Sequence, residues 1–435
     1  MARHPITGSD EGDNLVQALA SDAKGFGGLS GDVLSGWYGS DTLYGQGGSD
    51  VLIGGAGEDW HYGGADDDQR HASETNPGGG GNYLHGGAGN DHLVFGFMDK
   101  GQAYGGRGND TLDLTTYDAF GTFVPTIVTL VDGAGSALTA GQLIVFTGIE
   151  HLRVQTSQSD DVVTAAGGDN WIAVRHGDSL VSAGAGNDHV IYHSGGQNTL
   201  DGGAGCDVLE VSHTERWPGL VFTAAGGVVT DGNGSLVTGF ESFIVDGWRM
   251  NGHVVLGDGG DQFPGWTGDD TGEGGLGRDR PRGHGGDDLL FGGGGGDWIH
   301  GGSGDDVMEG GQGHDRLNGA LGFDTLTGGD GADYFRFRDL GETHDHVTDL
   351  VAGEDRLVYV RSLPGLSIDA QPGDPNFLAI NGPDAAHGQF VFFDGSQSNP
   401  GDLRRSPDGT GANGGDIVVV LDGVTSLSAD DFFLI

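Results

Sequence analysis

The chain has 435 residues, of which 92 are glycine, 64 are Asp or Glu and only 19 are Lys or Arg. The resulting net charge of −45 excludes the basic surface with which a protein binds nucleic acid. With 12 prolines and 35% hydrophobic residues, the glycine content fits neither collagen nor a flexible linker.

Other function classes are excluded by what the chain lacks. A single cysteine, Cys206, cannot form a disulfide framework within the chain. No apolar run reaches the roughly 18 residues of a transmembrane helix, so no membrane span is expected. Residues 1–20 lack the apolar segment of a cleaved N-terminal signal peptide, so none is expected either.

The first segment, residues 1–113, contains Asp at intervals of nine residues, at Asp32, Asp41, Asp50, Asp59 and Asp68. The nonapeptides GGAGNDHLV and GGRGNDTLD then place Asp91 and Asp110 at the same sixth position. Position eight is apolar in most repeats.

Two of these repeats depart from the pattern, because position eight is His61 in one and Arg70 in the next. Together with residues 71–81, they predict a disrupted rung or a protruding loop. The alternative is that an inward-facing His61 serves as a ligand or a catalytic group.

The second segment, residues 114–255, interrupts the repeats twice, at roughly 114–160 and 211–255. Between the interruptions, degenerate repeats carry Asp188 and Asp207. Both interruptions contain apolar stretches and end in a Gly-x-Glu signature, which includes Glu150 and Glu241. We expect longer solenoid coils here, with the two Glu in recurring turn or capping interactions. The alternative makes them catalytic carboxylates.

The third segment, residues 256–336, is the most regular, because eight consecutive nonapeptides fill residues 265–336. All eight have Asp at position six, and Asp261 extends the pattern one repeat upstream. The last six have an apolar residue at position eight. The first two have Gly272 and Pro281 there, which predicts a weak or bent rung near residues 264–282.

This periodicity predicts an all-β fold, a right-handed parallel β-roll or β-helix solenoid. The residues GGxGxD favour a turn, since glycine permits positive φ and close backbone approach, and the next three are long enough only for a very short strand. Two nonapeptides then make one coil of 18 residues, and coils stack at about 4.8 Å. Asp270, Asp288, Asp306 and Asp324 form one column under this arrangement, and the intervening four Asp form the other.

Columns of carboxylates about 5 Å apart repel one another unless cations lie between them. The pattern GGxGxDxUx, in which U is a large apolar residue, resembles the repeat of the RTX (hemolysin-type calcium-binding) family. The resemblance implies multiple Ca²⁺ ions that bridge adjacent coils. The predicted metal ligands are Asp32, Asp41, Asp50, Asp59, Asp68, Asp91, Asp110, Asp188, Asp207, Asp261, Asp270, Asp279, Asp288, Asp297, Asp306, Asp315, Asp324 and Asp333.

The last segment, residues 337–435, replaces glycine repeats with longer apolar strands and predicts a β-rich cap. Its first part resembles the region that closes the β-roll of serralysin-type secreted proteases. The final residues, LSADDFFLI, resemble a C-terminal type I secretion signal. These resemblances imply export by the type I secretion machinery and an extracellular location.

No catalytic motif accompanies the repeats, since the chain contains neither H-E-x-x-H nor G-x-S-x-G. The sequence therefore predicts an extracellular calcium-binding protein, structural or adhesive, that folds on binding calcium after secretion. The alternative is a carbohydrate-active β-helix enzyme, similar to a polysaccharide lyase or epimerase, with its site in residues 114–255. Trp60 and Trp298 occupy position seven and should face outward, where a polysaccharide or a cell surface is a candidate partner.

Overall fold

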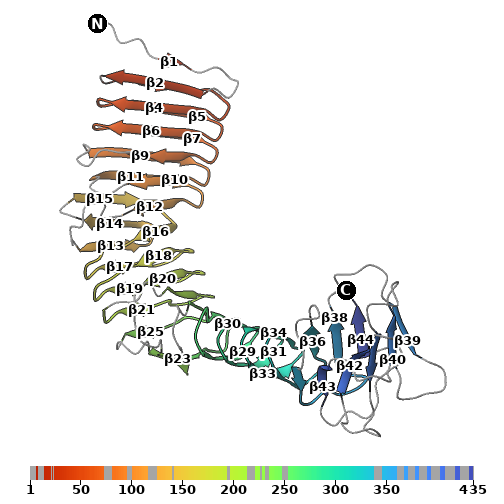
Figure 1. The fold of residues 1–435 in the computed structure, drawn as a ribbon. Coiled ribbons are helices and arrows are strands. Elements are labelled where there is room, and N and C mark those ends of the chain that lie inside the picture. Colours follow the sequence, from red (N-terminus) through yellow and green to blue (C-terminus); the bar gives the residue numbers. More distant parts are fainter. Residues whose placement is uncertain are drawn as a thin grey trace. The chain divides into compact units, whose positions relative to one another are not determined.

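The computed structural model shows strands stacked in successive coils (Figure 1). It describes residues 6–7, 14–20, 22, 24–72, 81–95, 100–115, 125–139, 142–193, 196–212, 221–225, 228–230, 235–246, 253–337, 345–359, 367–370, 378–381, 389–392, 402–406, 417–421 and 431–434. Within these ranges there is no α-helix, and hence none that could span a membrane. The predicted all-β class is confirmed.

Contacts between residues divide the chain into two compact units. Unit 1 consists of Met1–Ser212 and Asn233–Phe240, and unit 2 consists of His213–Gly232 and Glu241–Ile435. The four segments predicted above were defined by the repeat pattern and not by contacts between residues. The division into four segments therefore stays a prediction.

Unit 1 contains two stacks of strands. The first comprises β1 (Ile6–Thr7), β3 (Lys24–Phe26), β5 (Thr42–Gly47), β7 (Trp60–Ala65), β9 (Gly81–Ala88), β11 (Lys100–Arg107), β13 (Thr126–Val131), β14 (Ala134–Thr139), β15 (Gln142–Thr147), β17 (Val162–Thr164), β19 (Leu180–Ser182), β21 (Thr199–Asp201) and β25 (Leu236–Thr238). The second comprises β2 (Asn14–Ala20), β4 (Val33–Tyr38), β6 (Val51–Ala56), β8 (Gln69–His71), β10 (His92–Phe95), β12 (Thr111–Thr115), β16 (His151–Gln155), β18 (Trp171–Val174), β20 (His189–His193) and β22 (Val208–Ser212).

Unit 2 repeats the arrangement. Its first stack comprises β23 (Val221–Ala225), β24 (Val228–Thr230), β27 (His253–Val255), β29 (Thr271–Gly277), β31 (Leu289–Gly295), β33 (Val307–Gly313), β35 (Thr325–Asp330), β37 (Asp345–Val347), β41 (Gln389–Phe392), β42 (Asp402–Ser406) and β43 (Ile417–Leu421). Its second comprises β26 (Ser242–Asp246), β28 (Gln262–Pro264), β30 (Arg280–Gly285), β32 (Trp298–Ser303), β34 (Arg316–Leu321), β36 (Tyr334–Phe337), β38 (Arg356–Tyr359) and β44 (Phe432–Leu434). A separate hairpin joins β39 (Ser367–Ala370) and β40 (Leu378–Asn381).

In the regular repeats, each strand pairs in parallel with the strand one coil away in the chain. Leu289 of β31 pairs with Val307 of β33, which pairs with Thr325 of β35. The register of 18 residues is the predicted coil length. This pairing confirms the parallel β-solenoid.

The core is a column of the apolar side chains at position eight. In unit 2 these side chains are completely buried, and they are Leu290, Ile299, Met308, Leu317, Leu326 and Phe335. Because side chains alternate along a strand, positions six and eight face inward while positions seven and nine face outward. The burial of Leu289–Gly295 alternates accordingly.

The strands are longer than the three residues that the repeat pattern predicts. In unit 2, β31 continues beyond Phe291 through four glycines, and Gly293 and Gly295 pair with Gly311 and Gly313 of the next coil. Glycine has no side chain to separate neighbouring coils, so parallel pairing persists into the segment predicted to be only a turn.

The first interruption is not a longer coil as predicted but an antiparallel insertion in unit 1. β13, β14 and β15 pair antiparallel in succession, and the outer two pair in parallel with β17 and β11. Asp132 and Gly133 link β13 to β14, with φ of 51° and 74°. Two positive φ values in a two-residue loop are typical of a type I′ hairpin, which Asp-Gly favours.

The second interruption also contains an antiparallel pair, β23 with β24, in unit 2. β23 then pairs in parallel with β27, so the solenoid continues beside the hairpin. The expectation of longer coils was therefore wrong in both interruptions, because each contains an antiparallel hairpin.

The weak rung predicted near residues 264–282 is not found, since parallel pairing continues from β27 through β31 and from β28 to β30. Phe263, the position-eight residue of the preceding repeat, is fully buried. A Cβ atom on Gly272 would lie 2.7 Å from the Phe263 ring, so the ring fills the space that the missing side chain leaves.

Some of the described C-terminal strands extend the solenoid of unit 2, whereas β42 pairs antiparallel with β41 and β43. β36 pairs in parallel with β38, and β38 pairs with β44, whose Phe432 lies opposite Leu357. The apolar tail that resembles a secretion signal therefore forms the last described strand of this stack.

Candidate metal centre

The predicted Asp side chains form ladders inside the turns. Within a ladder, Oδ1 accepts a hydrogen bond from a backbone N–H one coil earlier, as Asp297 does from Asp279 at 2.8 Å and Asp306 does from Asp288 at 2.9 Å. All of the predicted ligands are buried, with at most 2% of each exposed: Asp32, Asp41, Asp50, Asp59, Asp68, Asp91, Asp110, Asp188, Asp207, Asp261, Asp270, Asp279, Asp288, Asp297, Asp306, Asp315, Asp324 and Asp333.

The two predicted columns of the regular block are confirmed as structural features. One ladder runs from Asp270 to Asp324, and a second runs from Asp279 to Asp333. In unit 1, a similar ladder connects Asp32, Asp50, Asp68, Asp91 and Asp110.

The second carboxylate oxygen is the unusual feature, because a buried charged atom is costly unless it is paired. In eleven of these residues Oδ2 is buried and accepts no hydrogen bond. They are Asp50, Asp91, Asp110, Asp188, Asp279, Asp288, Asp297, Asp306, Asp315, Asp324 and Asp333.

Backbone oxygens lie beside seven of these atoms, and in each of the seven repeats the first residue is glycine. They are the atoms of Asp50, Asp91, Asp110, Asp279, Asp288, Asp297 and Asp315. A Cβ atom on Gly274 would lie 2.6 Å from Oδ2 of Asp279 and 2.5 Å from the carbonyl oxygen of Gly292, one coil further along the chain. Any side chain at this position would collide with both oxygens. Glycine thus allows a carboxylate and a carbonyl from adjacent coils to converge.

Burial raises the pKa of the carboxyl groups of the regular block from Asp279 to Asp333, although the hydrogen bonds from backbone N–H groups lower it. The pKa of Asp279 and that of Asp306 are raised to about 8. Burial likewise raises the pKa of Asp288 to about 6. Without a cation, Asp279 and Asp306 in the folded turns therefore favour the protonated form at neutral pH.

This donor set suits calcium, which takes six to eight oxygen ligands from carboxylates and backbone carbonyls in flexible geometry. Among the described residues, no three His, Cys, Asp or Glu side chains converge as a metal cluster. A site in these turns would therefore draw part of its ligands from backbone carbonyls.

Sequence reasoning missed that the inner ladders continue through residues other than the predicted ligands. Glu150 accepts the N–H of Asp110 at 2.8 Å, which confirms the structural interpretation of this Glu. Other acceptors in such ladders are Asn82, Asp161, Asn170, Ser179, Asn198, Ser235, Asp345 and Asp355. Their signal in the sequence was a short polar residue at the sixth position of a degenerate repeat.

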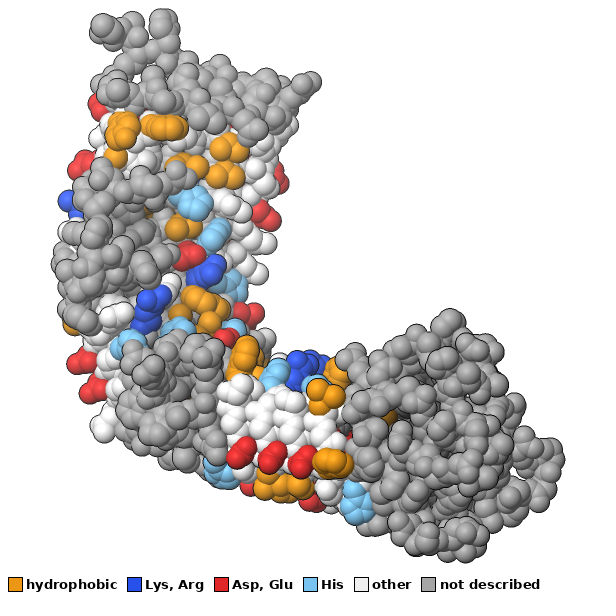
Figure 2. All heavy atoms as spheres, viewed as in Figure 1, with side chains coloured by type: hydrophobic (Ala, Val, Ile, Leu, Met, Phe, Trp, Pro, Cys, Tyr) orange, Lys and Arg blue, Asp and Glu red, His pale blue; other side chains and the backbone are white. Residues whose placement is uncertain are grey.

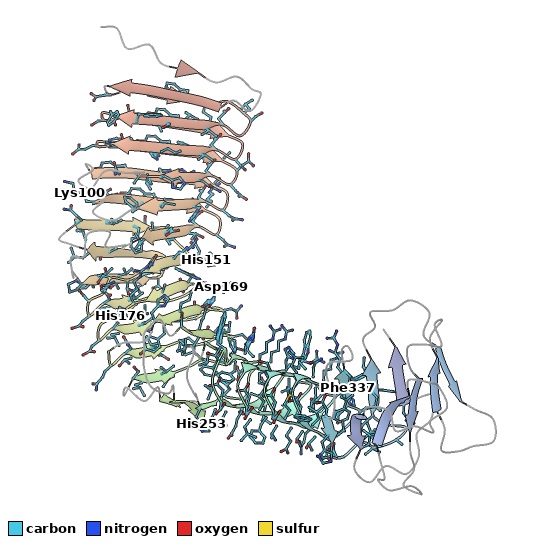
Figure 3. The ribbon with its side chains drawn as sticks, in the orientation of Figure 1. Lys100, His151, Asp169, His176, His253 and Phe337 are labelled. Carbon is cyan, nitrogen blue, oxygen red and sulfur yellow. The ribbon has the colours of Figure 1, made fainter. Side chains whose placement is uncertain are left out.

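A second ladder, at position five, was also missed. Here the acceptor lies one coil earlier than the donor, as when Oδ1 of Asp287 accepts the N–H of Asp305 at 2.8 Å. His151 plays this part for Asp169, whose N–H lies 2.9 Å from Nδ1, and Figure 3 labels both residues. Exposed side chains thus support the turn from the side opposite to the inner ladder.

At three predicted ligands a protein group contacts Oδ2. Gly28 donates its N–H to Asp32, Gly257 donates to Asp261, and the Arg70 guanidinium lies 2.7 Å from Asp68. These three sites therefore differ from the eleven above.

Arg70 and His61 do not mark a disrupted rung, and the protruding loop that was the other prediction falls mainly on residues 73–80, which lie outside the described residues. Both side chains are completely buried, and both lie in regular parallel pairings, His61 between Leu43 and Leu84. Burial, followed by the charge of Arg70, lowers the pKa of His61 to about 3, so this imidazole is neutral.

The Arg70 side chain extends beneath Gly63, where a Cβ atom would collide with it. Its Nη2 atom contacts Asp68 at 2.7 Å and Asp91 at 3.2 Å, and it donates a hydrogen bond to the carbonyl of Gly86 at 3.0 Å. An internal cation thus bridges two successive carboxylates of one ladder, with a carbonyl as its third partner.

Trp60 and Trp298 face outward as predicted, with 42% and 40% of their surfaces exposed. Trp60 stacks on Tyr83 with 4.1 Å between ring centroids. Among the described residues, no observation favours the alternative of a carbohydrate-active enzyme.

A parallel β-solenoid with rows of buried carboxylates beside glycine carbonyls has the features of a calcium-binding repeat protein. The family model described as RTX calcium-binding nonapeptide repeat (4 copies) matches residues 26–60, 35–69, 78–97, 102–114, 164–196, 282–317 and 309–338. The chain therefore carries RTX nonapeptide repeats, which bind calcium. No curated protein matches the chain.

Proposed function

We propose that this chain is a secreted calcium-binding solenoid in which calcium ions lie between successive coils and drive folding. The observation that supports it is the row of buried Oδ2 atoms without a hydrogen bond, seven of which lie beside a backbone carbonyl of the next coil. Calcium would neutralise these carboxylates, and its binding free energy would contribute to folding.

The ligands in this proposal are the eleven Asp residues with such an Oδ2, together with the glycine carbonyls beside them. Asp32, Asp68 and Asp261 are less suited, because a backbone N–H or a guanidinium already contacts their Oδ2. Without calcium, repulsion between the columns keeps the chain loose, which suits export by a type I system. The folded solenoid then serves a structural or adhesive role outside the cell.

The test is a calcium titration of the EDTA-treated chain, followed by far-ultraviolet circular dichroism, with magnesium as a control. We expect a cooperative change from coil to β-structure with calcium in the range of about 10⁻⁴–10⁻³ M, and none with magnesium. A full β-spectrum in EDTA would refute calcium-driven folding.

Two adjacent residues provide a matched pair of variants. Asp306→Asn keeps an oxygen for the inner ladder but removes the buried charge, so it should raise the calcium midpoint and lower the number of bound ions. Asp305→Asn alters an exposed residue of the outer ladder, whose Oδ1 accepts the N–H of Phe323 at 2.9 Å. It should leave both quantities unchanged, and equal effects of the two changes would contradict the assignment of ligands.

A further inference from the structure

Five of the twelve arginines of unit 2 lie at outward positions of one stack, although acidic residues outnumber basic ones more than threefold in the chain. The strands of this face are β28, β30, β32, β34, β36 and β38. Their positions seven and nine are Gln262, Pro264, Arg280, Arg282, Trp298, His300, Arg316, Asn318, Tyr334, Arg336, Arg356 and Val358. None of these twelve residues is acidic. The arginine strip comprises Arg280, Arg282, Arg316, Arg336 and Arg356.

The other stack of unit 2 has a different surface. The position-nine residues there include Glu273 and Glu309, and the outer ladder beside it consists of Asp269, Asp287 and Asp305. In Figure 2, basic side chains gather at one edge of this unit, and acidic side chains form a row apart from them. The inward positions are alike in both stacks, so folding alone does not require the arginines.

Aromatic rings alternate with the arginines along the position-seven column. The register places Trp298, Arg316, Tyr334 and Arg356 one after another, and Arg280 lies one coil before them. Trp298 and Tyr334 are 40% and 37% exposed. Since coils stack at about 4.8 Å, arginines of this column recur about every 10 Å with a ring between them.

Most of the strip has no anionic partner of its own. Among the described residues, no Asp or Glu forms an ion pair with Arg280, Arg282, Arg316 or Arg336. The guanidinium of Arg316 lies 5.8 Å from the centre of the Tyr334 ring, and Arg356 donates to the carbonyl of Asp355 at 2.8 Å.

Two adjoining hollows indent this face and share Trp298 and Arg316. One has a volume of about 350 Å³, and the described residues that line it are Trp298, Arg316, Leu317, Asn318, Tyr334, Arg336 and Val358. The other has a volume of about 330 Å³ and includes Gln262, Arg278 and Arg280 in its lining, together with Asp261 and Asp279 of the inner ladder.

The first hollow also contains two buried polar atoms without a partner, Oδ1 of Asn318 and Nε of Arg336. An amide oxygen and a guanidinium nitrogen together would recognise a ligand that carries both a hydroxyl donor and an anionic acceptor.

We propose that this face binds a linear polysaccharide that carries carboxylate groups, with sugar rings in the two hollows. Arginine pairs with carboxylates through its planar fork of donors, and exposed Trp and Tyr stack on the apolar faces of sugar rings. The net charge of −45 opposes any polyanion, so this binding would depend on the local excess of arginine on the strip.

The proposal is tested with the full chain in saturating calcium, by calorimetric titration with octamers of a 1,4-linked uronic acid. A neutral glucan octamer and a single-stranded DNA oligonucleotide are the comparison ligands. We expect binding of the uronate octamer that weakens at high salt, and affinity lower by tenfold or more in Arg316→Gln. Arg316→Lys should restore only part of it, because Lys keeps the charge but not the planar fork.

The control is Arg153→Gln in unit 1, which removes the same charge from an exposed arginine outside the strip and should leave the affinity unchanged. Far-ultraviolet spectra of all variants in calcium identify any loss through misfolding, and Trp298→Ala provides a second test if Arg316 variants fold poorly. Absence of uronate binding, equal binding of the neutral glucan, or tighter binding of DNA at the strip would overturn the proposal.

Discussion

Replacement of Arg70 by leucine tests whether a cation is needed to stabilise the buried carboxylates of the turns. The change gives position eight its usual apolar side chain but removes the cation between Asp68 and Asp91. Removal of one partner from a buried ion pair typically costs about 3–5 kcal/mol, because the remaining charge stays buried without compensation. We expect a loss of that size in the local stability of this coil at low calcium.

The loss should shrink as calcium rises, since the vacated space lies between two carboxylates and the carbonyl of Gly86, which are calcium ligands by type. Hydrogen exchange of residues 51–72 and 81–95 measures the local free energy of opening directly, which suits a repeat protein whose global unfolding need not be two-state.

The matched control is Leu93→Ala, at the residue that pairs with Arg70 in the next coil. This cavity should cost about 2–5 kcal/mol at any calcium concentration, since no charge is exposed. If calcium relieved both variants equally, or neither, the view of Arg70 as an internal substitute for a metal ion would be refuted.

Three further predictions follow from the same geometry. Gly301→Ala should destabilise the calcium-loaded fold by about 1–3 kcal/mol in chemical denaturation, because its Cβ would collide with Oδ2 of Asp306, whereas Gly81→Ala has open space and should be neutral. The pKa of Asp279 and that of Asp306, raised to about 8 when folded, exceed the unfolded value near 3.8. Acidification in EDTA should therefore favour the metal-free fold, so the β-signal in circular dichroism should rise as pH falls from 8 toward 4, and a falling signal would contradict this. Phe263→Ala should lower thermal stability by the equivalent of about 3–5 kcal/mol, because the ring fills the core of two coils; a change below 1 kcal/mol would show that the gap collapses.

The nine-residue period made the fold and the inner Asp columns predictable, because each coil repeats the contacts of the last. Position eight is apolar where the sequence is regular, and those residues are the core. The repeat pattern gave wrong predictions where position eight is not a large apolar residue and a neighbouring side chain compensates for it. Phe263 fills the space beside Gly272, and Asp68 and Asp91 pair with the charge of Arg70. Such compensation depends on which side chain lies next to the residue in the fold, and the repeat pattern alone does not show this.

The insertions show a second limit. Asp132-Gly133 is a local hairpin signal, but the apolar stretches around it were interpreted as parallel coils because the surrounding repeats are parallel. The outer ladder was missed for a related reason. Position five accepts Asp, Asn, Ser and His alike, so no single residue type marks it.

Side chains at inward positions of a strand determine calcium binding and folding, whereas side chains at outward positions are available to bind a ligand. Substitutions at the two kinds of position should therefore affect different measurements. Asp315 faces the calcium turns, while its neighbour Arg316 lies on the strip. Asp315→Asn should raise the calcium midpoint for folding yet leave uronate affinity unchanged once calcium saturates. Arg316→Gln should do the opposite, with circular dichroism and calorimetric titration as the two measurements. If either change moved both quantities, the strip and the turns would be one coupled site, and the outward face could not be treated as free to vary on a calcium-stabilised scaffold.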